Sequence, residues 1–255
     1  MTKTSAAEFS GTRKATRVAV LSDVHGNAVA LEAVLGEIES EAPDLVVFGG
    51  DLTWGPLPEE TMELVASLRT PALFVRGNSE RTLLEGSESP TERERWLLER
   101  HSGQARAFLA TFVGQASVDI AGLGPARFCH GSPRSDEELV TPETPEERVR
   151  ALTATIPERV LVTAHTHLQF DRQVAGIRSI NPGSVGMPYE GRPGAFWALL
   201  GPDVELRRTD YSVERAVERY GASGDPMTEQ MVELLLAPPA RAEVIEHAER
   251  HVFSG

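Results

Sequence analysis

Residues 17–31 read RVAVLSDVHGNAVAL, and the interpretation of the whole chain starts from this stretch. Residues 18–21 are an unbroken apolar run, typical of a strand that is buried on both faces. Polar and small residues follow, and from Ala28 onward apolar residues recur at helical spacing, with Asn27 placed to cap the helix. The stretch therefore predicts a strand, a polar turn and a helix, which is the first half of a βαβ unit.

The same alternation continues along the chain. Helices are expected at 28–40 and 59–68, and strands at 45–48, 72–75, 117–120, 127–129, 160–163, 169–174, 178–180, 195–200 and 204–207. The later strands follow one another at short intervals, so this half of the sheet should be partly antiparallel. We expect a flexible N-terminal tail at 1–16, one domain at 17–210 that contains a helical insertion at 80–116, and a C-terminal helical extension at 211–255 packed on the same domain. Three helical stretches near 212–220, 227–236 and 240–252 make up that extension.

Composition excludes several classes of protein. The 255 residues include 25 Lys and Arg against 38 Asp and Glu, a formal net charge of −13, which argues against an extended basic surface for nucleic acid or an anionic membrane. The single cysteine, Cys129, cannot form an internal disulfide, and no apolar run suits a signal peptide or a membrane span. We therefore expect a cytoplasmic protein that binds neither nucleic acid nor membrane; its oligomeric state is left open.

Five short polar clusters stand at the ends of predicted strands, at 23–27, 50–51, 77–80, 130–131 and 164–167. The carboxyl ends of parallel strands converge on one crevice, so these clusters can become neighbours. Together they supply seven candidate metal ligands, namely Asp23, His25, Asp51, Asn78, His130, His165 and His167. A mixture of imidazole and carboxylate suits Zn, Mn, Fe or Ni, and seven candidates point to two divalent ions.

The order Asp-x-His, Gly-Asp, Gly-Asn-x-Glu, His-Gly and x-His-Thr-His, followed by the 181–186 turn, resembles the calcineurin-like metallophosphoesterase superfamily. The resemblance runs from about residue 18 to residue 206 and is greatest to the small prokaryotic phosphodiesterase branch. It implies an α/β fold of two packed mixed β-sheets flanked by helices, a four-layer αββα sandwich, with a dinuclear metal site at the strand ends.

Carried over motif by motif, the resemblance assigns each ligand to an ion. One metal would be held by Asp23, His25 and His167, and the other by Asn78, His130 and His165, with Asp51 bridging the two. Asp51, Asn78 and His130 are also the expected catalytic residues. The implied function is hydrolysis of small phosphate esters, in particular phosphodiesters, by in-line attack of a metal-bridging hydroxide.

Two residues depart from the family pattern. Ala164 replaces a glycine before the last motif, a small change that need not disturb the ligands. Ser79 stands where many members carry a histidine near the leaving group, so the general acid is not identified. Two alternative functions therefore stay open: a non-catalytic scaffold of the same fold, which would be expected to lack metal-site histidines, and a protein serine/threonine phosphatase, which would be expected to use the missing histidine.

Other residues have a structural interpretation beside a functional one. We expect Asn27 to be a helix cap rather than a ligand, Cys129 to be a buried thiol rather than a nucleophile, and the pair His247 and His251 to lie on a solvated helix face. The 181–186 turn is either a tight loop or a backbone cradle for phosphate.

Aromatic and basic side chains complete the set of candidates. The aromatic residues of the insertion form either its own core, which we favour, or a lid over the site; they are Trp96, Phe108 and Phe112. Arg76 and Arg192 are candidates for a phosphate contact.

Overall fold

In the computed structural model, which describes residues 13–250, the apolar run 18–21 becomes strand β2 (Val18–Leu21) at the centre of a five-stranded sheet. The strand order of this sheet is β11 (Val204–Thr209), β10 (Ala195–Leu200), β2, β3 (Leu45–Phe48) and β4 (Ala72–Phe74). Strands β2, β3 and β4 are parallel, whereas β10 is antiparallel to both of its neighbours. The carboxyl ends of β2, β3 and β4 therefore lie at one edge.

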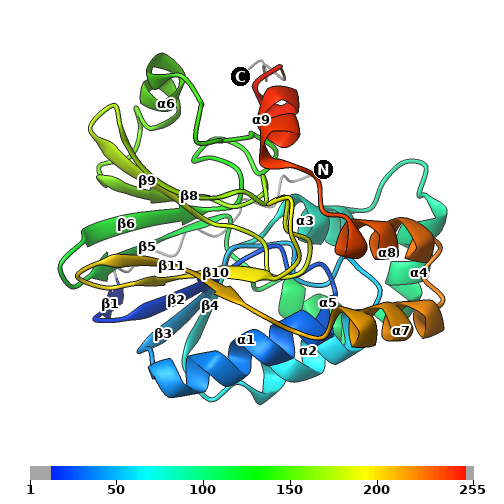
Figure 1. Cartoon of the computed structure of the whole chain (residues 1–255). Helices are drawn as coiled ribbons and strands as arrows, with labels where there is room; N and C mark the ends of the chain where they lie inside the picture. The colour runs from blue at the N-terminus through cyan, green and yellow to red at the C-terminus, as the bar shows by residue number, and fades with distance from the viewer. Residues whose placement is uncertain (1–12, 251–255) are drawn as a thin grey trace.

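A six-stranded sheet packs against the first, face to face (Figure 1). Its strand order is β1 (Arg13–Ala15), β5 (Gln115–Ile120), β6 (Gly124–Cys129), β7 (Val160–Val162), β9 (Ile177–Pro182) and β8 (Gln169–Val174). Strands β6, β7 and β9 are parallel, and the β5–β6 and β8–β9 pairs are antiparallel, as predicted for this half of the chain. Buried side chains such as Val20, Val47, Val118 and Ile180 fill the space between the sheets.

Helices cover the outer faces. Five of them lie on the five-stranded sheet: α1 (Ala28–Glu41), α2 (Pro58–Ser67), α3 (Asn78–Glu85), α4 (Glu92–Arg100) and α5 (Gly103–Leu109). Helix α6 (Glu146–Leu152) and the adjoining loops pack on the outer side of the six-stranded sheet through Val140, Leu152 and Phe170. The layered α/β architecture expected from the sequence is confirmed.

The C-terminal part of the chain folds onto the same body. Helices α7 (Val213–Ser223) and α8 (Thr228–Leu236) pack on α1, where Tyr220 and Leu235 meet Ala28 and Val29. Helix α9 (Arg241–Arg250) lies apart from them, beside the loops of the six-stranded sheet (Figure 1). Within residues 13–250, no helix is both long and apolar enough to span a membrane.

Three expectations need correction. Residues 13–15, assigned to a flexible tail, form edge strand β1 because they pair in parallel with β5; residues 1–12 lie outside the described part of the chain. Helix α6 has no counterpart in the prediction, because only two of its seven residues are buried and its apolar pattern is too short to detect. The third correction concerns the insertion.

The aromatic side chains of the insertion belong to the main core rather than to a core of their own. Phe74 of β4 stacks on Phe48 of β3 and on Phe112, with ring centroids 5.0 and 4.8 Å apart, and Phe108 meets the same ring edge-on. Trp96 joins this cluster. The outer face of the sheet is apolar, so the helices of the insertion bury their aromatic side chains against it rather than only among themselves.

Candidate metal centre

The predicted ligands follow the carboxyl ends of strands from both sheets. Asp23 and His25 follow β2, Asp51 follows β3, and Asn78 begins α3 just after β4. From the six-stranded sheet, the loop after β6 carries His130, and the loop after β7 carries His165 and His167. Backbone hydrogen bonds extend the β2–β3 pairing into the motifs, since the N–H groups of Asp23 and His25 donate to Gly50 and Asp51. The packing of the two sheets thus brings all seven residues to one edge.

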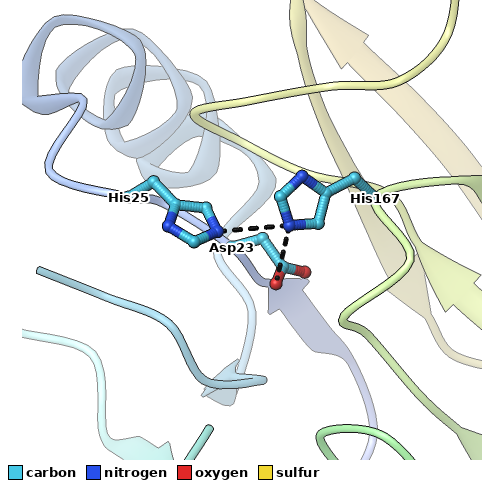
Figure 2. Close-up of side chains that lie close together, drawn as sticks. All are labelled: Asp23, His25 and His167. Atoms are coloured by element: carbon cyan, nitrogen blue, oxygen red, sulfur yellow. Dashed lines mark hydrogen bonds and ion pairs between the residues drawn. The ribbon is translucent and has the colours of Figure 1, made fainter. Parts of the chain in front are cut away.

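The first group consists of Asp23, His25 and His167, whose potential ligand atoms all lie within 4.8 Å of one another (Figure 2). The Nε2 atoms of the two imidazoles are 3.1 Å apart, and Nε2 of His167 is 3.3 Å from Oδ1 of Asp23. All three side chains are buried, and Oδ1 of Asp23 has no hydrogen-bond partner.

The protonation of both imidazoles is fixed by their second nitrogen. Nδ1 of His25 lies 3.1 Å from the carbonyl oxygen of Trp54, and Nδ1 of His167 lies 2.6 Å from that of Met187. A carbonyl oxygen only accepts, so each Nδ1 must carry a proton, and in a neutral ring Nε2 then carries a lone pair. Two lone pairs and a carboxylate oxygen converge on one point. This donor set fits a divalent transition metal, which would remove the repulsion between them.

The second group consists of Asp51, His130 and His165, with Asn78 beside it. Nδ1 of His130 donates to the carbonyl oxygen of Gly49 at 2.8 Å, so in the neutral ring its Nε2 carries the lone pair, and this atom lies 3.0 Å from Oδ1 of Asn78. Burial lowers the pKa of His130, but the carboxylates of Asp51 and Asp23 outweigh it and raise that pKa above its usual value, so a metal would bind here by displacing a proton. The imidazoles of His130 and His165 lie with ring centroids 4.9 Å apart. The donor chemistry is that of the first group, with an amide oxygen added.

Asp51 directs one carboxylate oxygen toward each group. Oδ2 lies 3.7 Å from Nε2 of His25, and Oδ1 lies 3.6 Å from Nε2 of His130. Oδ1 also accepts the backbone N–H of Ser79 at 3.0 Å, which fixes the orientation of the carboxylate. This geometry suits a bridging ligand.

Burial and charge determine the protonation of these groups. Burial lowers the pKa of His25 to about 4, and the neighbouring His167 acts in the same direction. Burial likewise lowers the pKa of His165 to about 4, assisted by His130. For Asp23, burial by itself would raise the pKa, but His167 and the other histidines hold it below its usual range. Near neutral pH, His25 and His165 are therefore neutral and Asp23 is ionised, which are the forms that bind metals.

Five of the seven predicted ligands have a left-handed backbone, with φ between 48° and 64°: Asp23, His25, Asp51, His165 and His167. Among residues 13–250, only Ala42 and Ala175 share this conformation outside glycine. Non-glycine residues avoid it because Cβ approaches the following carbonyl oxygen. The strained backbone is concentrated where the side chains converge, as is common at functional sites.

Glu80 supports the site although the sequence did not suggest a role for it beyond its place in the third motif. Its buried carboxylate accepts three backbone N–H groups, from Asp51 at 2.9 Å, Leu52 at 2.8 Å and Gly77 at 2.8 Å. It therefore ties the loop after β3 to the loop after β4. Burial, together with the Asp51 carboxylate, raises the pKa of Glu80 to about 7, against the effect of the three donors.

The 181–186 turn is a structural loop rather than a phosphate cradle. The N–H groups of Val185 and Gly186 donate to the carbonyl oxygens of Ser22 and Asp23, and that of Gly183 donates to Oδ1 of Asn181. The hydroxyl of Ser184 also donates to the carbonyl oxygen of Asp23, at 2.7 Å. These donors are already used within the protein, so the turn acts by holding the end of β2.

Helix α9 fixes another loop at the site. Arg241 pairs with Glu190 at 2.5 Å, and Glu190 also accepts the N–H of Gln169. Next to Glu190, the ring of Tyr189 stacks on that of His167 with centroids 4.5 Å apart. The C-terminal helix thereby supports a loop that covers one predicted ligand.

The remaining candidates have structural roles. Asn27 caps α1 through a hydrogen bond from Ala30 to its Oδ1, and Cys129 is buried, which raises the pKa of its thiol. His247 lies on α9, whereas His251 falls outside the described residues, so the expectation for that pair stays a prediction.

Comparisons with known proteins agree with this fold. The model of the calcineurin-like phosphoesterase superfamily domain matches residues 16–200. An uncharacterized protein of Methanocaldococcus jannaschii is 25% identical over 230 residues, which are 79% of this chain and 90% of that protein. A metallophosphoesterase from Sphaerobacter thermophilus superposes with a TM-score of 0.70 at 26% identity, covering 88% of this chain and 99% of that one. A hypothetical protein from Pyrococcus horikoshii, at 20% identity and the same coverage, has the same fold with a TM-score of 0.76.

Proposed function

The chain belongs to the calcineurin-like phosphoesterase superfamily, and we propose that it is a hydrolase of phosphodiesters that uses two divalent metal ions. The observation that carries this proposal is the pair of imidazole Nε2 atoms 3.1 Å apart, each left with a lone pair because its Nδ1 donates to a carbonyl oxygen. A scaffold would have no need to maintain this arrangement together with a strained backbone at five ligand positions.

Asp23, His25 and His167 would hold one ion, and Asn78, His130 and His165 the other, with Asp51 shared between them. When bound, such ions lower the pKa of water and neutralise charge on the phosphoryl group. The carbonyl oxygens of Trp54, Met187 and Gly49 keep the imidazoles in the tautomer that the ions require.

In the reaction, a water oxygen forms a bond to phosphorus opposite the leaving group, and the bond from phosphorus to the leaving oxygen breaks. The proton lost by the water ends on the leaving alcohol. Ser79 is buried at the start of α3, and its hydroxyl is too weak an acid to protonate that alcohol efficiently. Esters with good leaving groups should therefore react fastest.

The charge of the site accounts for the binding of an anion by an acidic protein. Two divalent ions carry four positive charges, against two negative charges from Asp23 and Asp51. The pocket would be locally positive although the net charge of the chain is −13, so a phosphate ester is attracted to it.

The test combines metal content with activity. Purified protein is analysed for bound metals and assayed with bis(p-nitrophenyl) phosphate and p-nitrophenyl phosphate in Mn²⁺, Ni²⁺, Zn²⁺ and Fe²⁺. We expect up to two ions per chain and faster hydrolysis of the diester. Asp51→Asn should reduce metal affinity and activity by about 100-fold or more, because it weakens a ligand to both ions, whereas the exposed Asp203→Asn should leave both unchanged. Full activity after exhaustive chelation, or no hydrolysis of either ester in any metal, would refute the proposal.

A further inference from the structure

A cavity of about 350 Å³ opens beside His130, on the side of the second ligand group. Strand β5, helix α3 and the loop after β6 contribute its walls; the lining residues used below are His130, Arg76, Arg81, Arg134 and Asp136. Three arginines thus line one cavity together with a single acidic residue. A substrate whose phosphorus lies at the ligand groups would have one of its arms in this cavity.

Two of the three arginines are already paired with carboxylates of the loop after β6. Arg81 donates to Asp136 at 2.7 Å and to Glu137 at 2.5 Å. Arg134 pairs with Glu138, a buried carboxylate that also accepts from Ser132. These two arginines therefore fix the shape of the cavity wall and have little capacity left for a ligand.

Arg76 differs from its two neighbours. Its side chain is 25% exposed, and within residues 13–250 its guanidinium makes no hydrogen bond; its one ion pair is a 3.9 Å approach to Glu85, which is 61% exposed. The side chain is thus partly buried at the wall of the cavity, and the five N–H donors of its guanidinium have no close protein acceptor. Planar, bidentate binding of carboxylate or phosphate is what an arginine in this position provides.

The position of Arg76 is also fixed relative to the ligand groups. Its backbone N–H donates to Val113 at 2.8 Å, and it directly precedes Gly77 and Asn78, which lie against Asp51 and His130. The guanidinium is thus attached to the same rigid turn that presents a predicted ligand. An anion held by Arg76 would therefore lie within the reach of one arginine side chain from the turn that presents Asn78.

We propose that Arg76 recognises a second anionic group on the substrate, a carboxylate or a phosphate, carried on one arm of the phosphodiester that enters the cavity beside His130. This inference rests on the proposed function and narrows it. The substrate class becomes a phosphodiester with an additional negative charge a short linker away from the phosphorus that is attacked. Diesters that lack this additional charge would also be hydrolysed, but with lower kcat/KM.

Two matched pairs of esters test the proposal in protein loaded with Mn²⁺. In the first pair the arm that stays is charged or neutral: p-nitrophenyl 2-carboxyethyl phosphate against its 2-carbamoylethyl amide. In the second pair the departing arm differs: ethyl 4-carboxyphenyl phosphate against its 4-carbamoyl analogue. A phosphonate in place of the carboxylate in the preferred pair then shows which anion fits better.

In one pair, wild-type protein should prefer the charged ester by about 10- to 100-fold in kcat/KM, the range expected for a hydrogen-bonded charge pair. Arg76→Gln should abolish this preference while changing the kcat/KM of the neutral ester by less than about threefold, and Arg76→Lys should retain part of it. Arg69→Gln removes the same charge from an exposed position outside the cavity and should retain the full preference. No preference in either pair, or an equal loss for both esters in Arg76→Gln, would overturn the inference.

A binding measurement separates this inference from the proposed function. Titration calorimetry compares ethylphosphonate with 2-carboxyethylphosphonate, neither of which is hydrolysed. Tighter binding of the carboxylate compound, lost in Arg76→Gln, supports the role of Arg76 even if no ester is turned over, an outcome that would refute the proposed function alone. Equal binding of the two phosphonates, together with hydrolysis of the esters that lack the second charge, would refute the role of Arg76 but not the proposed hydrolase function.

Discussion

Replacing Glu80 with alanine should both destabilise the protein and weaken metal binding at the second candidate site. The carboxylate is fully buried and is the acceptor for the backbone N–H groups of Asp51, Leu52 and Gly77. Without it, three buried donors lose their partner, in two loops that carry predicted ligands. Each unpaired buried group costs about 1–3 kcal/mol, and water entering the space left by the side chain would keep the total near the lower end, at about 3 kcal/mol.

For a chain of this length, about 1 kcal/mol corresponds to about 2–4 °C in Tm, so Glu80→Ala should lower Tm by about 6–12 °C. The Tm of Glu80→Gln should lie between those of the wild type and Glu80→Ala. Its amide oxygen can still accept the N–H groups of Asp51 and Gly77, which share one carboxylate oxygen in the wild type. Loss of the support behind Asp51 should also weaken Mn²⁺ binding by about 10- to 100-fold.

Thermal unfolding followed by circular dichroism, with and without Mn²⁺, measures both effects. Glu99→Ala is the matched control, since Glu99 is an exposed residue of α4, and it should change neither Tm nor metal affinity. If Glu80→Ala unfolds at the wild-type temperature and binds Mn²⁺ as well as the wild type does, the three hydrogen bonds do not hold the site in the way described.

Three further predictions concern the leaving group, the C-terminal helix and the cysteine. Ser79→His should raise turnover of alkyl esters by about 10²-fold or more, with little effect on nitrophenyl esters, because only the former need an acid; parallel plots of log rate against leaving-group pKa for the two proteins would contradict this. Arg241→Ala leaves the Glu190 carboxylate, which is 7% exposed, without its cation, and should lower Tm by about 4 °C or more at about 2 kcal/mol; an unchanged melting curve would show that α9 does not hold the Glu190 loop. Cys129 is 3% exposed with a raised thiol pKa, so at pH 8 it should react with a thiol reagent only at the rate of unfolding; rapid labelling of native protein would mean that β6 opens locally.

The sequence was sufficient to predict the strands and the helices that carry the candidate site. The expected bounds of β2, β3, β8 and β10 agree with the structure, because buried strands carry an apolar pattern that polar turns interrupt sharply. The prediction that polar clusters at strand ends would meet followed from the geometry of parallel strands, and the structure does bring the two groups of ligand atoms together. Binding of metal by these residues stays a prediction.

The groups that orient the ligands could not be predicted from the sequence, for a physical reason. The carbonyl oxygens of Trp54 and Met187 belong to the backbone, so no side-chain type marks them in the sequence. Glu80 accepts the N–H of Asp51 from 29 positions away, a contact that only the packed loops create. The burial of Phe108 against Phe74 likewise depends on how the insertion closes over the sheet.

The left-handed backbone at the predicted ligands has an evolutionary consequence. At about 1–2 kcal/mol each, five such residues oppose folding by about 5–10 kcal/mol, which is comparable to the whole net stability of a typical domain. Glycine would relieve the strain at any of these positions, so the substitutions that abolish metal binding include ones that stabilise the fold. If the proposed hydrolysis is the function of this chain, a lineage released from selection for it would therefore drift toward a stable protein without these aspartates and histidines.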